Sequence, residues 1–278
     1  MRKMLRVVLA FQIFLTPARG LDLPEDFVYG ATGQFTQGGL VVLALTGDTQ
    51  VALNGEVLPV VNKHTLIGFG RDAKLAHELR FTRKGKSETV PMTLKKRAYN
   101  IQRIDGLPPA MVNPPEEALP RIIRGGKLKR AARAIDSRRA DFTEDFIWPV
   151  KGRMTGVYGS QRFYNGEARR PHFGIDIAAP RGTKVIAPAP GKVTLAEPDM
   201  YFEGGLIFID HGLKLTSAYM HLDTLKVKPG DEVKAGDVIA TVGSTGRSTG
   251  PHLDWRMFWR GQRIDPALVV TGALEPLQ

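Results

Sequence analysis

The chain has 278 residues, of which 42% are hydrophobic and 24% charged, a formal net charge of +11 and no cysteine. This length supports two modest hydrophobic cores, so we expect two domains and a connector. The lack of cysteine excludes disulfides and thiolate zinc sites. Histidine and carboxylate therefore remain as the protein ligands for a metal ion.

Residues 1–20 have the pattern of a secretory signal peptide. Basic residues at the start precede an apolar run from Val7 to Leu15, and small residues follow at Ala18 and Gly20. The run is shorter than the ~20 residues that a membrane-spanning helix needs, so we expect cleavage near Gly20 rather than a permanent anchor. The mature protein would then be at most peripheral to a membrane, in the periplasm or cell envelope.

The predicted signal contains four basic and no acidic residues, so the mature chain would carry 11 − 4 = +7 charges. A basic surface favours polyanionic partners. An exported protein rarely meets nucleic acid, so an acidic polymer of the envelope is the expected partner. A basic surface that only confers solubility is the alternative.

Residues 21–104 consist of short β-rich runs between turn signals, which predicts a small β-sandwich. Asn54-Gly55 separates two such runs, and both residues tolerate the positive φ angles of a tight hairpin. A second hairpin is expected at Lys84-Gly85-Lys86. His64 and His77 have no metal-ligand spacing, and we expect them on the surface or in turns.

Residues 105–145 are predicted to form a linker and a helix. The stretch from Gly106 to Pro120 is rich in proline and indicates an extended linker. Leu128, Ala131, Ala132 and Ile135 then recur at helical spacing. The stretch between Arg121 and Ala140 holds eight Lys or Arg and one acid, so this basic helix either touches an anionic polymer or presents a solvated face.

From residue 146 onwards, glycine and proline punctuate short alternating strands, and four of the six histidines occur here. His211 falls between two predicted strands, so we expect a turn residue rather than a ligand. His172 and Asp176 lie four apart in a segment whose β-branched residues oppose a helix. A flat strand would hold them ~13 Å apart, so the backbone must bend at Gly174 for both to reach one ion.

His252 and Asp254 lie two apart in a predicted strand, so they project from the same face. One of them can bind metal while the other handles a proton. His221 lies at the end of another predicted strand, where an isolated histidine is more often a structural residue.

These elements, in this order, resemble the lysostaphin-type, or LytM-type, zinc endopeptidases of the bacterial cell wall. The resemblance runs from about Phe146 to Leu268 and includes the Tyr219-Met220-His221-Leu222 run, a Lys-Pro-Gly-Asp-x-Val turn and a Ser-Thr-Gly-Pro-His-Leu run. It implies a mainly β protein whose C-terminal domain, residues 146–272, is antiparallel and grooved. The predicted N-terminal sandwich and the helical connector lie outside the resemblance.

Carried over residue by residue, the resemblance makes His172 and Asp176 ligands of Zn²⁺, and His221 and His252 the catalytic pair. The family's third ligand is a histidine two residues after His252, where this chain has Asp254. Carboxylates also bind zinc, so we expect Asp254 to complete the site. A second anionic ligand lowers the acidity of the bound water, which predicts a slower enzyme, another divalent ion, or lost turnover.

The resemblance implies a metal-dependent endopeptidase that hydrolyses the peptide cross-links of peptidoglycan. Tyr164, in the loop before His172, is a candidate for contacting substrate at the developing oxyanion. Arg162, Arg169 and Arg170 lie in the same loop and are candidates for meeting the carboxylates of a peptide stem. The alternative is a non-catalytic groove that binds murein or activates an amidase.

Overall fold

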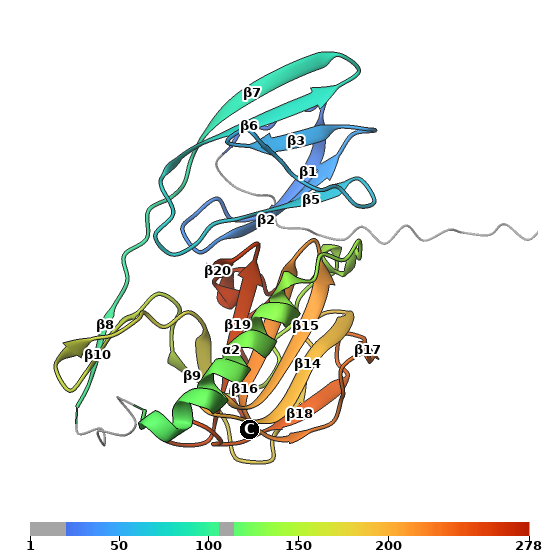
Figure 1. The fold of residues 1–278 in the computed structure, drawn as a ribbon. Coiled ribbons are helices and arrows are strands. Elements are labelled where there is room, and N and C mark those ends of the chain that lie inside the picture. Colours follow the sequence, from blue (N-terminus) through green and yellow to red (C-terminus); the bar gives the residue numbers. More distant parts are fainter. Residues whose placement is uncertain (1–20, 106–113, 278) are drawn as a thin grey trace, which may run out of the picture.

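The computed structural model describes residues 21–105 and 114–277 (Figure 1). The predicted signal peptide and most of the proline-rich stretch lie outside these residues. Within them the protein is mainly β and contains one α-helix, which confirms the predicted fold class. No helix in these two segments has the length and apolar character needed to cross a membrane.

The N-terminal part consists of two antiparallel sheets around one core. The first contains β1 (Val28–Gly33), β2 (Leu40–Leu45) and β5 (His64–Gly68), and the second β3 (Gln50–Leu53), β4 (Glu56–Val57), β6 (Ala76–Arg83) and β7 (Lys86–Thr93). Alternation along the strands buries Leu43, Leu45, Leu79 and Phe81 completely.

Both predicted hairpins are confirmed. Asn54 and Gly55 join β3 to β4 with φ angles of 50° and 84°, and Lys84 and Gly85 join β6 to β7 with φ angles of 49° and 77°. These left-handed conformations match the twist of the paired strands. His64 begins β5 and His77 lies within β6, both partly exposed.

The connector is built into the second half of the molecule. After it passes η1 (Glu116–Ala118), the chain forms α2 (Leu119–Ala134), which lies across the long strands of the C-terminal sheet (Figure 1). The apolar face differs from the predicted one: Gly125 and Ala132 are buried and Leu128 is partly buried, whereas Ala131 is exposed. The helix ends before Ile135, so that residue cannot extend the buried stripe.

The basic residues of α2 do more than face solvent. Arg121 pairs with Asp199, Arg124 with Glu197 at 3.8 Å, and Lys129 with Glu203. A Cβ added to Gly125 would lie 3.1 Å from the sulfur of Met200, so this glycine lets the helix approach the sheet closely.

The C-terminal part is one ten-stranded antiparallel sheet. Its main path runs β17-β14-β15-β16-β19-β12-β9, and β13, β18 and β20 pair beside it. The strands on the main path are β9 (Arg153–Gly156), β12 (Ile175–Ala178), β14 (Gly191–Met200), β15 (Gly204–Gly212), β16 (Leu215–Leu225), β17 (Glu232–Val233) and β19 (His252–Trp259). The three beside it are β13 (Lys184–Ile186), β18 (Val238–Val242) and β20 (Gln262–Ile264).

The expectation that His211 occupies a turn is wrong. It lies in β15 and is fully buried, with Nδ1 donating to the Pro190 carbonyl at 2.6 Å and Nε2 2.8 Å from the Ser217 hydroxyl. The turn comes two residues later, where Leu213 and Lys214 have φ angles of 48° and 63°. Two polar partners explain why a histidine is tolerated in this core.

The two halves pack against each other. Arg97 forms a 2.8 Å ion pair with the buried Asp265, and Gly68 lies against the ring of Trp259. In addition β8 (Ile101–Ile104), at the end of the predicted N-terminal domain, pairs in parallel with β10 (Gln161–Tyr164). β10 also pairs with β11 (Glu167–Ala168), so a three-stranded sheet borders the C-terminal groove.

Candidate metal centre

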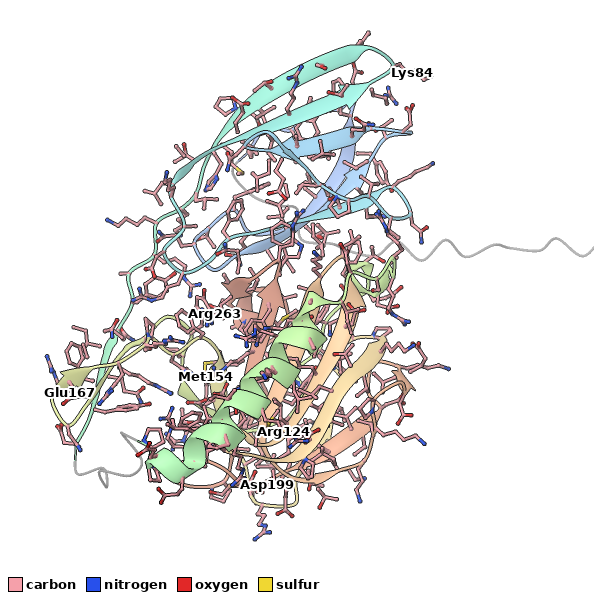
Figure 2. The ribbon with its side chains drawn as sticks, in the orientation of Figure 1. Lys84, Arg124, Met154, Glu167, Asp199 and Arg263 are labelled. Atoms are coloured by element: carbon pink, nitrogen blue, oxygen red, sulfur yellow. The ribbon has the colours of Figure 1, made fainter. Side chains whose placement is uncertain are left out.

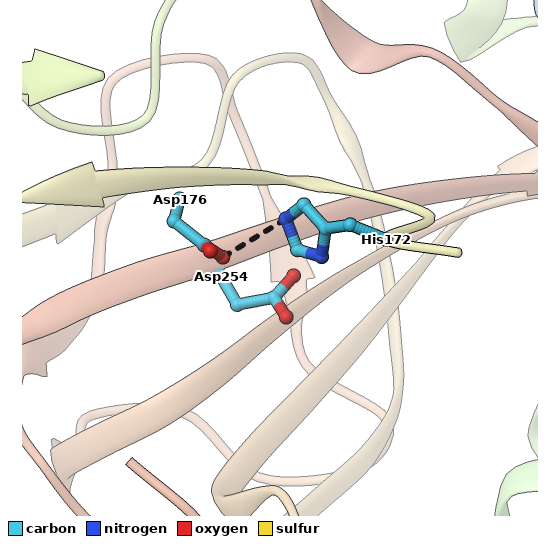
Figure 3. Close-up of side chains that lie close together, drawn as sticks. All are labelled: His172, Asp176 and Asp254. Carbon is cyan, nitrogen blue, oxygen red and sulfur yellow. Dashed lines mark ion pairs between the residues drawn. The ribbon is translucent and has the colours of Figure 1, made fainter. Parts of the chain in front are cut away.

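Strand register brings two carboxylates face to face. Asp176 of β12 and Asp254 of β19 are direct partners in the antiparallel ladder. Directly opposed residues have Cβ atoms about 5 Å apart and project from the same face. Two acids far apart in the sequence therefore meet on one surface of the sheet (Figure 3).

His172 reaches this surface because the chain bends just before β12. Its backbone pairs with Ser160 (N···O 2.9 Å) and Gly159 (O···N 2.7 Å), and a bend follows at Gly174, as the sequence predicted. A Cβ at residue 174 would lie 2.6 Å from Oδ1 of Asp254, so only glycine fits there. The bend leaves the buried imidazole of His172 facing both carboxylates.

Ligand atoms of His172, Asp176 and Asp254 all lie within 4.8 Å of one another. Nε2 of His172 is 3.1 Å from Oδ1 of Asp176 (Figure 3). Both of these atoms are buried without a hydrogen-bond partner among the described residues. Two donors on one tetrahedral zinc ion are about 3.4 Å apart, so this pair fits a metal well.

Asp254 is held differently, by a residue that the sequence-based prediction missed. Arg256 donates to both of its oxygens, from Nε to Oδ1 at 2.9 Å and from Nη2 to Oδ2 at 2.6 Å. Burial would raise the pKa of Asp254, but the guanidinium outweighs burial and holds that pKa below its usual value. A carboxylate has about four acceptor sites, so Asp254 keeps room for a cation.

Asp176 also has an arginine partner. Nη2 of Arg162, from β10, donates to its Oδ2 at 2.9 Å. Burial and the facing carboxylate act to raise the pKa of Asp176, but His172 and Arg162 outweigh them and hold it below its usual value. Both carboxylates are therefore ionised at neutral pH, and each has a compensating positive charge.

The two remaining histidines lie side by side next to this cluster. The ring centroids of His221 and His252 are 4.7 Å apart. Nδ1 of His221 lies 2.8 Å from the Thr245 carbonyl, and Nδ1 of His252 2.8 Å from the Gly250 carbonyl. A carbonyl only accepts, so each Nδ1 carries the proton and each Nε2 is left as a proton acceptor.

A backbone irregularity positions His221. The residue has a φ of 63°, rare outside glycine, and the β15–β16 register shifts between Gly205 and Ile207. Such bulges redirect a side chain and occur often beside active sites. Burial lowers the pKa of His221, which keeps this imidazole neutral and able to accept a proton.

One groove of about 680 Å³ contains most of these groups. Its lining includes Asp176, Asp254, His221 and His252, whereas His172 lies buried behind it. Tyr164 lines the same groove, from strand β10 rather than from a loop. α2 contributes one wall.

The arrangement defines a class of protein: a grooved antiparallel β domain with a cluster of three side chains that could hold a cation and two histidines beside it. A model of Peptidase family M23 matches residues 170–266, the segment that contains all five of these side chains. The C-terminal part of the chain therefore contains a Peptidase M23 domain, as the sequence resemblance predicted.

Three known proteins illustrate the likeness. A peptidase M23 structure from Pseudomonas aeruginosa is 27% identical and superimposes with a TM-score of 0.63 over 85% of this chain and 95% of that one. The murein hydrolase activator NlpD of Escherichia coli is 38% identical over 119 residues, 43% of this chain and 29% of its own. The peptidoglycan DD-endopeptidase ShyB of Vibrio cholerae is 40% identical over 95 residues, 34% of this chain and 22% of its own. The chain thus spans less than a third of either curated relative.

Proposed function

We propose that this protein is a zinc-dependent endopeptidase that hydrolyses the peptide cross-links of peptidoglycan. The observation that carries the proposal is the buried pair of His172 Nε2 and Asp176 Oδ1, which face each other at 3.1 Å beside two imidazole acceptors while neither atom has a hydrogen-bond partner among the described residues. Buried polar atoms are nearly always satisfied, so a buried donor set of this chemistry supports the proposal that these residues hold a cation.

In this proposal His172, Asp176 and Asp254 hold the metal, which when bound polarises the scissile carbonyl and acidifies a water molecule. His221 or His252 accepts the water proton at Nε2 and returns it to the leaving amine. Hydrogen bonds from each Nδ1 to a backbone carbonyl keep both rings in the required tautomer. The Tyr164 hydroxyl, in the same groove, donates to the oxyanion.

Arg256 offsets the negative charge of Asp254, which as a second anionic ligand would otherwise lower the acidity of the metal-bound water. Its guanidinium contacts both oxygens of Asp254, so the pair is formally neutral, as a histidine ligand would be. In this proposal the substitution of aspartate for histidine leaves the charge of the centre unchanged. Substrate location and the predicted signal peptide support a site of action in the periplasm or cell envelope.

The test is cleavage of purified muropeptide dimers, followed by chromatography, together with elemental analysis of the purified protein. We expect about one zinc per chain, loss of cleavage with a chelator, and loss on His252→Ala with zinc retained. Cleavage that survives both the chelator and His252→Ala would refute the assigned mechanism.

A second candidate is a non-catalytic protein that binds murein or activates a separate amidase. The two arginines favour it, since Arg162 and Arg256 place positive charge beside the carboxylates that a cation would need. The named activity of the NlpD relative also supports it. Metal-free protein that binds murein and stimulates an amidase, with no product under any divalent ion, would establish this candidate instead.

A further inference from the structure

The groove carries more positive than negative charge. Five cationic and three acidic side chains line it, so its net charge is 5 − 3 = +2 with the histidines neutral. Three of the cations form ion pairs with the three acids; the pairs are Arg162 with Asp176, Arg256 with Asp254, and Lys129 with Glu203. The groove is therefore suited to an anionic ligand, even though its centre contains two carboxylates.

Two of the five cations, Arg170 and Arg247, are exposed and lie next to site residues. Arg170 is two residues before His172, and Arg247 lies in the loop that leads to His252. The guanidinium carbon of Arg247 lies 4.6 Å from the centroid of the Phe202 ring. An arginine held on an aromatic ring loses less side-chain freedom when it binds a ligand.

Guanidinium groups recognise carboxylates through paired, charge-assisted hydrogen bonds. Arg170 and Arg247 are better placed than Arg162 to bind a ligand carboxylate, because both are exposed. The side chain of Arg162 is only 17% exposed and pairs with Asp176. We propose that Arg170 and Arg247 select peptide stems with free carboxylates, and that amidation of those carboxylates weakens binding. This inference rests on the proposed function, because it assumes peptide stems as ligands of the groove.

The test uses metal-free protein and calorimetric titration with a synthetic stem tetrapeptide, either with free side carboxylates or with the same groups as carboxamides. The amidated peptide should bind about tenfold more weakly, the effect of one lost charge-assisted hydrogen bond. Arg247→Gln and Arg170→Gln should each reduce the preference, and the double variant should bind both peptides equally.

Lys84→Gln is the matched control, since it removes one positive charge at the β6–β7 turn, far from α2 and the groove (Figure 2). It should leave the preference unchanged. Equal affinity for the two peptides, no measurable binding of either, or an equal loss in Lys84→Gln would each overturn the inference.

The outcome is separable from that of the proposed function. A protein that prefers the free acid but cleaves nothing supports the inference and refutes the endopeptidase. A protein that cleaves amidated and free-acid cross-links equally, with equal affinities, supports the endopeptidase and refutes the inference.

Discussion

Replacing Arg256 with glutamine tests whether the positive charge of this side chain takes the place of a metal ion beside Asp254. Asp254 is 2% exposed, and Arg256 supplies the hydrogen bonds to both of its oxygens. Removing one partner of a buried ion pair costs about 3 to 5 kcal/mol. For a chain of this size that corresponds to a fall in Tm of about 10 °C in metal-free protein.

The same substitution should strengthen zinc binding. A unit charge about 5 Å from a divalent ion contributes about 7 kcal/mol of repulsion at an effective dielectric constant of 20. Removing even part of this repulsion should tighten zinc binding by about 10- to 100-fold. Added zinc should therefore raise the Tm of Arg256→Gln more than that of the wild type.

The assay is a pair of thermal melts, without and with zinc, plus a zinc titration against a competing chelator. Arg260→Gln is the matched control, because Arg260 pairs with the exposed Glu56 and its loss should cost less than about 1 kcal/mol. A fall in zinc affinity of Arg256→Gln by about 10- to 100-fold would refute the reasoning. Arg256 would then act to orient Asp254 on the metal.

Three further predictions concern packing and pH. Gly174→Ala should lower stability and zinc affinity together, because its Cβ would lie 2.5 Å from the Arg256 side chain and 2.6 Å from a carboxylate oxygen. Burial lowers the pKa of His211 from about 6.5 to about 4. Its contribution to stability is therefore complete above pH 6.5 and is lost as the pH falls towards 4. Denaturant titrations over this range should show a loss of about 3 kcal/mol in the free energy of unfolding. Arg97→Gln leaves the buried Asp265 unpaired and should cost about 3 kcal/mol in chemical denaturation.

Each of these has a control within the chain. Gly126→Ala, at a helical position with open space, should raise stability by about 0.5 to 1 kcal/mol. His211→Asn should flatten the pH profile, and an unchanged slope would assign it to other groups. Asp72→Asn removes an exposed ion pair and should change little; a loss as large as that of Arg97→Gln would show that domain docking does not depend on the buried pair.

Local patterns predicted the mainly β character of both parts and both N-terminal hairpins, since alternation and Asn-Gly turns act within a few residues. The sequence did not predict the buried face of α2, because that face depends on how the helix packs against the sheet. Gly125 allows the close approach there, since a Cβ added to it would lie 3.1 Å from the sulfur of Met200, a residue 75 positions away that helical periodicity does not reveal.

The site shows the same division. The bend at Gly174 followed from a distance argument, and the shared face of His252 and Asp254 followed from strand alternation. The left-handed φ of His221 could not be foreseen, because it depends on an extra residue in β16 relative to β15. Its isolated position in the sequence gave no sign of the bulge that turns it towards His252.

Arg256 could have been predicted, and it bears most on the function. Side chains two apart in a strand share a face, so the alternation that pairs His252 with Asp254 also places residue 256 beside the same carboxylate. Strand alternation alone therefore predicts that an arginine two residues after a candidate metal-ligand aspartate pairs with it. The choice between a neutralised metal ligand and a metal-free salt bridge therefore depends on Asp254 and Arg256 together, and a substitution at either position alone changes both stability and metal affinity.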